Sequence, residues 1–215
     1  MKKISEIYSE YNIMPNLQEH MLRVAAVAYL ICDNFDGQLD KEEIIVAALL
    51  HDMGNIIKFK LELFPKFTKP EGEEYWQAVK EEYLKKYGAN EYDASIKIAE
   101  ELGVSPRVIE LIKSISFLGI SKTLEENDYA KKIIEYGDDR VNPFRVVSLE
   151  DRLTDLRTRY AHRDKERGNN FREVFENSMR QIEQQIFSRC KIKPEDVNND
   201  TVAPIITELK NFVIK

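Results

Sequence analysis

Helical periodicity is the feature that most constrains this chain. Apolar residues recur every three or four positions along most of its 215 residues, as on one face of an amphipathic helix. In the segment 17–31, for example, Leu17, Met21, Val24 and Ile31 fall at this spacing. Only 8 glycines and 7 prolines interrupt such segments, which is too few for a sheet protein with many tight turns. The sequence therefore predicts an all-α fold, a single-domain helical bundle.

Capping residues and helix breakers divide this pattern into elements. Asp40 begins a capping-box pattern, and the Ser-Pro pair at 105–106 is typical of a helix start. Asn16 is the expected cap of the second helix, and Gly54 is the expected end of the third. The segment 56–70 contains two prolines and is expected to form an irregular loop. Further helices are expected near 3–12, 71–87, 91–102, 126–136, 144–162, 170–190 and 201–213.

Charge and cysteine content exclude several classes of protein. The 38 acidic residues outnumber the 32 basic ones, so the net charge of −6 predicts no duplex nucleic acid partner. The N-terminus lacks the apolar core of a signal peptide, and the longest apolar run, 24–32, is too short to span a membrane. Cys32 and Cys190 lie far apart, which is typical of reduced thiols. We therefore expect a cytoplasmic protein with no membrane partner.

The sequence AALLHDMGN, residues 47–55, places His51 and Asp52 at the end of an apolar run. Burying such an ionisable pair costs on the order of several kcal/mol unless something compensates it. His20 lies on the preceding helix, which the short turn at 33–40 must pack antiparallel to this one. These ligand types suit one divalent ion, namely manganese, iron, cobalt, nickel, zinc or magnesium. A hydrogen-bonded His–Asp pair in the core is the alternative.

The order of these residues resembles the HD superfamily of metal-dependent phosphohydrolases, whose pattern is H…HD…D on an all-α bundle. The stretch EHMLRVAAVA, which contains His20, is similar to the family's first-histidine helix, and AALLHDMGN is similar to the end of its HD helix. The resemblance covers about residues 16–160 and implies an HD-type core there. We expect one domain, 1–215, with a C-terminal helical arm at about 161–215.

The resemblance also implies a fourth metal ligand after His20, His51 and Asp52. Asp138 lies in EYGDDRVNPF, which resembles a Y-A-D-x-R-V segment that some relatives carry, and it is the ligand we expect. Asp151, in SLEDRLTDL, is the alternative, because other branches of the family read A-D-R-L there. Many relatives that bind two metals have further histidines between HD and the last aspartate. Residues 53–137 contain none, so we expect a single metal ion.

Three basic residues are candidates to hold phosphate oxygens: Arg23, Lys58 and Arg140. A guanidinium fork matches the geometry of a phosphate, and a lysine supplies a point charge. Many relatives have lysine directly after HDxG, but this chain has Asn55 at that position. The third histidine, His162, lies in a strongly polar stretch and is excluded from the site.

The reaction implied by the resemblance is hydrolysis of a small phosphate ester, by a phosphomonoesterase or a phosphodiesterase, with a nucleotide as one candidate substrate. The expected partner is therefore a small anionic molecule that bears phosphate, and the sequence leaves the oligomeric state open. The alternative is a regulatory HD module that binds a metal or a nucleotide without turning it over. The missing lysine favours that alternative, and the four-ligand set favours the enzyme.

Overall fold

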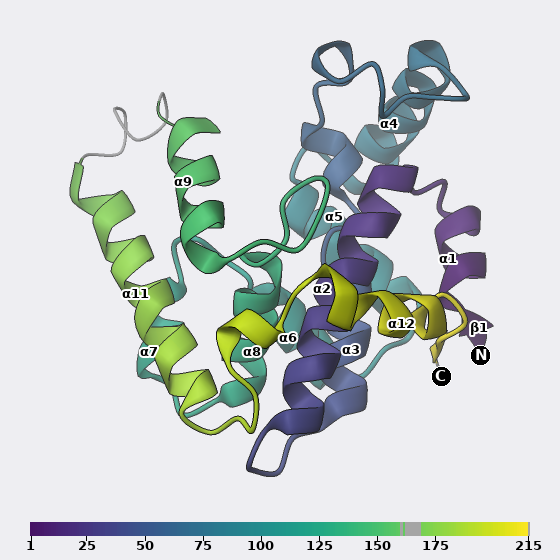
Figure 1. Cartoon of the computed structure of the whole chain (residues 1–215). Coiled ribbons are helices and arrows are strands. Elements are labelled where there is room, and N and C mark those ends of the chain that lie inside the picture. Colours follow the sequence, from purple (N-terminus) through teal and green to yellow (C-terminus); the bar gives the residue numbers. More distant parts are fainter. Residues whose placement is uncertain (160, 162–168, 215) are drawn as a thin grey trace.

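The computed structural model describes residues 1–159, 161 and 169–214, and helices make up nearly all of its regular structure (Figure 1). The structure confirms the all-α prediction. His162, which the sequence excluded from the site, lies outside the described residues. The helices are α1 (Ile4–Glu10), α2 (Pro15–Asn34), α3 (Lys41–Leu50), α4 (Glu73–Tyr87), α5 (Glu91–Glu101), α6 (Pro106–Ser114), α7 (Ile120–Glu125), α8 (Tyr129–Asp138), α9 (Leu149–Arg159), α11 (Asn169–Phe187) and α12 (Asn199–Leu209). The short strands β1 (Lys2–Lys3) and β2 (Val213–Ile214) pair antiparallel.

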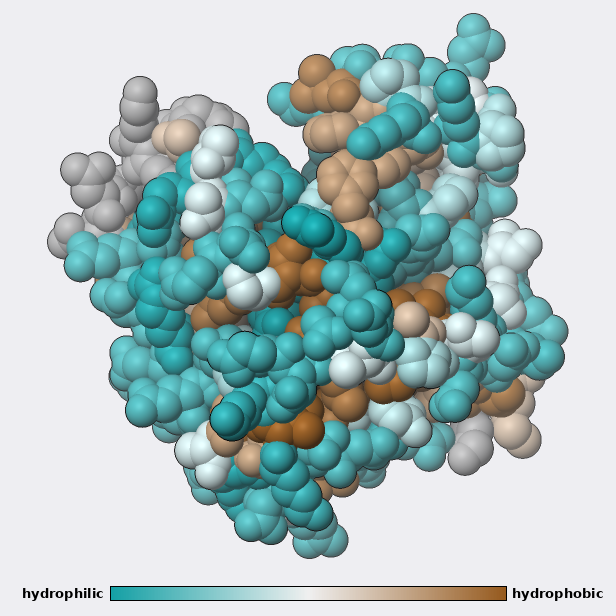
Figure 2. Space-filling model, viewed as in Figure 1, coloured by the Kyte–Doolittle hydropathy of each residue, from teal (hydrophilic) through white to brown (hydrophobic). Residues whose placement is uncertain are grey.

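The long helix α2 lies at the centre of the bundle, with α3, α8 and α12 packed against it (Figure 1). Its residues Met21, Val24 and Ile31 are fully buried, as their spacing predicts. Burying each such side chain contributes roughly 1.5–3 kcal/mol. The visible surface in Figure 2 is mostly hydrophilic, with hydrophobic residues in smaller areas between the polar ones. In the described part of the chain, no helix combines the length and apolarity that a bilayer requires.

Two predicted helix starts are confirmed by their capping hydrogen bonds. The Asp40 side chain accepts a hydrogen bond from the Glu43 amide at 3.1 Å, and Ser105 Oγ accepts one from the Val108 amide at 3.2 Å. The predicted cap Asn16 is wrong. Met14 occupies that position, and Pro15 is the first helical residue, where a missing N–H costs nothing.

Other boundaries differ because the chain folds back on itself locally. The helix expected from 144 begins at Leu149, since the Asn142 side chain accepts amide hydrogen bonds from Phe144 and Arg145 in a turn. The segment 56–70 is the expected loop, with two short 3₁₀ helices, Asn55–Lys58 and Leu61–Leu63. The sequence did not predict α7 or the two strands, because each is too short to show a period.

Gly54 does not end α3, which stops at Leu50; instead it lets two segments approach closely. A Cβ atom at Gly54 would lie 2.3 Å from the carbonyl oxygen of Glu91 and 2.7 Å from the Cβ atom of Ala94. The Gly54 amide donates to Ser95 Oγ at 2.9 Å. The turn that follows the His-Asp pair is therefore fixed directly against α5.

We expect Gly54→Ala to lower the free energy of unfolding by about 1–3 kcal/mol, because the added methyl group must displace backbone. Gly119→Ala is the control, because Gly119 has the same φ of −88° as Gly54. A Cβ atom added at Gly119 would lie 3.5 Å from its nearest neighbour, the Cβ atom of Ser116. That control should change the unfolding free energy by no more than about 0.5 kcal/mol. Urea titration of both variants measures the difference, and equal effects would contradict the close approach.

Candidate metal centre

Four side chains meet inside the bundle, one from the first turns of α2, two from directly after α3 and one from the end of α8. His20 lies in the first turns of α2, His51 and Asp52 directly follow α3, and Asp138 is the last residue of α8. The ligand atoms of the first three lie within 4.8 Å of one another. Asp138 Oδ1 lies 2.9 Å from His20 Nε2 and 3.6 Å from His51 Nε2. The four residues therefore form one compact cluster.

The antiparallel packing of α2 and α3 is what brings the two histidines together. Their ring centroids lie 5.4 Å apart. The neighbouring residues of α2, such as Val24, and of α3, such as Leu50, are fully buried and fix how these helices lie against each other. His20 therefore lies on the interior side of α2, the side that also carries Val24.

The orientation of His51 leaves one ring nitrogen directed at the cluster. Its Nδ1 lies 2.8 Å from the carbonyl oxygen of Ala48, and because a carbonyl only accepts, Nδ1 carries the proton. In a neutral imidazole the lone pair is then on Nε2. That atom is buried without a hydrogen-bond partner among the described residues, at 3.6–3.8 Å from the Asp138 and Asp52 carboxylates. A backbone bond on the far nitrogen is the usual support of a metal-binding histidine.

The electrostatics of the cluster favour positive charge at its centre. Burial lowers the pKa of His51, but the carboxylates of Asp52 and Asp138 outweigh this and raise it to about 9. Burial raises the pKa of Asp138, but the imidazoles of His20 and His51 beside it hold that pKa well below its usual value. Two carboxylates and two imidazoles with an unsatisfied Nε2 are a donor set that fits one divalent cation.

The fold and this cluster define a class: all-α proteins that bring histidine and aspartate side chains together at one point inside a helical bundle. The model of the HD domain matches residues 17–156, well over half of the chain, and the chain belongs to the HD-domain family. The HD domain is associated with metal-dependent phosphohydrolases. No curated protein and no solved structure matches the chain.

The two candidates for the fourth ligand lie in different surroundings. Asp138 joins the cluster through the contacts given above, whereas Asp151 is an exposed residue of α9. Asp139, the neighbour of Asp138, is buried within electrostatic range of Arg152 and Arg172. The geometry therefore favours Asp138 as the fourth ligand.

Loss of an outer-shell partner typically weakens metal binding about 10–100-fold. We expect Asp138→Asn, which removes a direct ligand, to weaken binding of a divalent ion by more than this. Asp151→Asn removes a carboxylate of the same size from an exposed position and should leave the affinity within about twofold. Calorimetric titration of both variants with manganese measures the difference. The opposite order of effects would transfer the fourth ligand to Asp151.

The three predicted phosphate-binding residues lie in three different settings. Arg23 follows His20 by one turn of α2, so both lie on one face. Its Nη2 donates to Glu19 at 2.7 Å, and its Nη1 is buried without a hydrogen-bond partner among the described residues. Lys58 lies at the end of the first 3₁₀ turn after the cluster, half exposed, with its Nζ 3.6 Å from the Glu91 carboxylate.

Arg140 corrects the prediction, because its guanidinium is used inside the protein. It is only 3% exposed, and it donates to the carbonyl oxygens of Val147 at 2.5 Å, Val197 at 2.7 Å and Pro194 at 3.2 Å, and to the Tyr136 hydroxyl. Four of its five N–H groups are used in these hydrogen bonds, and the side chain is buried among them. Arg140 therefore holds the segment before α12 against α8 and does not bind phosphate.

The sequence did not single out Tyr92, yet this residue lies beside the cluster. Burial raises the pKa of the Tyr92 hydroxyl, and the nearby Lys58 lowers it. The carboxylates of Asp52 and Asp138 raise this pKa further, so the Tyr92 hydroxyl lies within electrostatic range of these two carboxylates. Its ring is 5.5 Å from Lys58 Nζ and is half exposed. Periodicity gave no signal for this, because Tyr92 lies on the outward side of α5.

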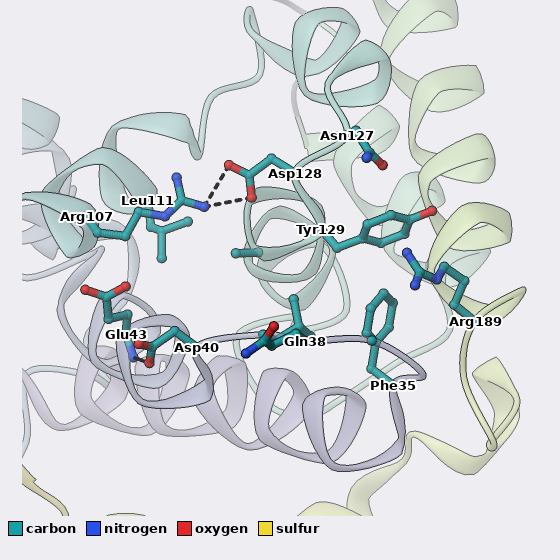
Figure 3. A pocket seen from close by; sticks show the side chains of 13 residues that line it. Phe35, Gln38, Asp40, Glu43, Arg107, Leu111, Asn127, Asp128, Tyr129 and Arg189 are labelled. Atoms are coloured by element: carbon teal, nitrogen blue, oxygen red, sulfur yellow. Dashed lines mark hydrogen bonds and ion pairs between the residues drawn. The ribbon is translucent and has the colours of Figure 1, made fainter.

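A larger cavity of about 510 Å³ lies elsewhere, between the α2–α3 turn and the start of α8 (Figure 3). Phe35, which lines it, directly follows the last residue of α2, and that helix rises roughly 21 Å between His20 and Asn34. Two aspartates that line this cavity have structural roles. Asp40 caps α3, and Asp128 caps α8. Asp128 also accepts the two hydrogen bonds from Arg107 that are drawn in Figure 3. We therefore place the functional site at the histidine cluster.

Proposed function

We propose that this protein is a metal-dependent phosphohydrolase that acts on a small phosphate ester. The observation that carries the proposal is the convergence of His20, His51, Asp52 and Asp138, with His51 Nε2 buried and without a hydrogen-bond partner among the described residues. These residues would hold one divalent ion. When bound, such an ion lowers the pKa of a water molecule and polarises a phosphoryl oxygen.

The remaining parts of the site orient the ester. The Arg23 Nη1 group is a preformed donor for a phosphoryl oxygen, because its other terminal nitrogen is fixed by Glu19. Lys58 adds positive charge at the exposed side of the cluster. The hydrogen bond from His51 Nδ1 to Ala48 keeps that imidazole in one tautomer throughout. This arrangement would position the phosphate and compensate its charge.

A panel of small phosphate esters and nucleotides, assayed with added manganese, cobalt, nickel or magnesium, tests the proposal. We expect phosphate release with at least one metal and none after chelation. We also expect Arg23→Gln to raise KM, because it removes a phosphate contact and leaves the four ligands in place. Metal binding at the cluster without turnover of any ester would instead support the regulatory module.

A further inference from the structure

A second feature of the site is a cavity of about 210 Å³ that lies between α5 and α6 and reaches His51. Its lining comes from α5, α6 and the loop that follows α6. The residues are His51, Tyr92, Ile96, Ile112, Lys113, Ile115 and Ser116. Because His51 belongs to the metal cluster, the cavity opens beside the position where the phosphate of a substrate would be held.

Tyr92 provides an independent link between this cavity and the cluster. It lines the cavity, and its hydroxyl lies within electrostatic range of Asp52 and Asp138. Ser116 fixes the opposite wall, because its amide donates to the buried carboxyl group of Glu135 at 3.0 Å. The cavity is therefore a recess of the same site and not a separate pocket.

The lining combines apolar side chains with polar groups and carries one positive charge. Three isoleucines and a tyrosine ring form the walls, and none of the seven lining residues is acidic. Lys113 is exposed and makes no ion pair or hydrogen bond with its side chain in the described part of the chain. Lys58, by contrast, lies 3.6 Å from Glu91. An anionic molecule with an apolar group matches this lining.

The volume limits how large that apolar group is. Pockets for drug-sized ligands span about 300–1,000 Å³, and an engineered apolar cavity of about 150 Å³ holds benzene. A cavity of about 210 Å³ therefore accommodates one ring with small substituents and not a nucleoside.

We propose that this cavity receives the organic group of the substrate and that this group is compact, largely apolar and about one ring in size. Lys113 then supplies a charge that attracts the phosphate end of the ester. This inference rests on the proposed function, since it assigns a substrate class to the same site.

Binding of two phosphonates to the manganese-loaded protein tests the inference without relying on turnover. Phenylphosphonate carries the ring and methylphosphonate lacks it, and neither has an ester bond to hydrolyse. We expect the wild-type protein to bind phenylphosphonate about tenfold or more tightly than methylphosphonate, because the ring is buried. Equal affinities for the two phosphonates would overturn the inference without any variant.

Two matched variants then locate the ring. Ile96→Trp fills the cavity and should weaken phenylphosphonate about tenfold while leaving methylphosphonate within about twofold. Ile109→Trp makes the same change at a partly buried position of α6 outside the cavity and should alter neither affinity. Lys113→Gln should weaken both phosphonates about two- to fivefold, and this loss should vanish in high salt. Equal responses of the two isoleucine variants would overturn the inference.

The same variants separate a failure of the inference from a failure of the proposed function. Phosphate release from phenyl phosphate reports hydrolysis, and calorimetry with phenylphosphonate reports the cavity. Ring-dependent binding that Ile96→Trp abolishes, without hydrolysis of any ester, supports the cavity and contradicts the phosphohydrolase. Hydrolysis of phenyl phosphate that is unchanged by Ile96→Trp supports the phosphohydrolase and overturns the cavity.

Discussion

Replacing His51 by alanine is expected to abolish stoichiometric metal binding while the helices stay formed. The imidazole contributes the buried Nε2 atom that has no other partner among the described residues, so its loss removes a ligand from the centre of the cluster. Loss of a mere outer-shell partner already costs about 10–100-fold in metal affinity. The helices should persist because α3 ends at Leu50, before the substituted residue.

Thermal unfolding with and without metal measures this effect, and each protein serves as its own control. A ligand present at about 100 times its dissociation constant stabilises the folded state by about 2.7 kcal/mol. The wild-type protein should therefore unfold at a higher temperature with manganese than with a chelator. His51→Ala should unfold at one temperature under both conditions. A variant that keeps the full shift would show that the metal binds elsewhere.

Replacing Arg140 by alanine is expected to lower the free energy of unfolding by about 3–5 kcal/mol, because several buried acceptors lose their hydrogen-bond donor at once. The guanidinium donates to three backbone carbonyls, and two of them, from Pro194 and Val197, belong to the segment before α12. Each buried acceptor left without its donor costs roughly 1–3 kcal/mol. The change should therefore loosen the C-terminal part of the chain and leave the metal cluster intact.

Urea unfolding of Arg140→Ala beside Arg145→Ala measures the effect. Arg145 is exposed on the following turn, so its loss should change the unfolding free energy by no more than about 0.5 kcal/mol. Manganese affinity of the Arg140 variant, measured where the protein is folded, should equal that of the wild type. Unchanged stability combined with weaker phosphonate binding would return Arg140 to the role that the sequence predicted.

The elements that carry the cluster could be predicted from the sequence because their signals are local. The period of α2, the cap at Asp40 and the short turn between α2 and α3 together require antiparallel packing. That packing places His20 against His51 without further information. The resemblance to HD proteins then added Asp138, which the geometry places with them and which no spacing rule supplies.

The roles of Arg140, Tyr92 and Lys113 could not be predicted, because each depends on contacts distant in sequence. The chemistry of a guanidinium made Arg140 a candidate for a phosphate contact, yet the partners of Arg140 include carbonyl groups more than fifty residues later. Tyr92 and Lys113 are exposed residues of amphipathic helices. In the sequence, such positions look the same as any other position on the solvated face of a helix. Only the packing of α5 beside α6 places them around one cavity.

The most direct test of the metal-dependent phosphohydrolase is phosphate release from the best ester of the panel while the metal-free protein is titrated with manganese. The four-residue cluster predicts a rate that is zero in chelator, rises with added metal and reaches its plateau at about one equivalent per chain. A rate that does not depend on metal would contradict the proposal. So would one bound equivalent of metal with no phosphate released from any ester.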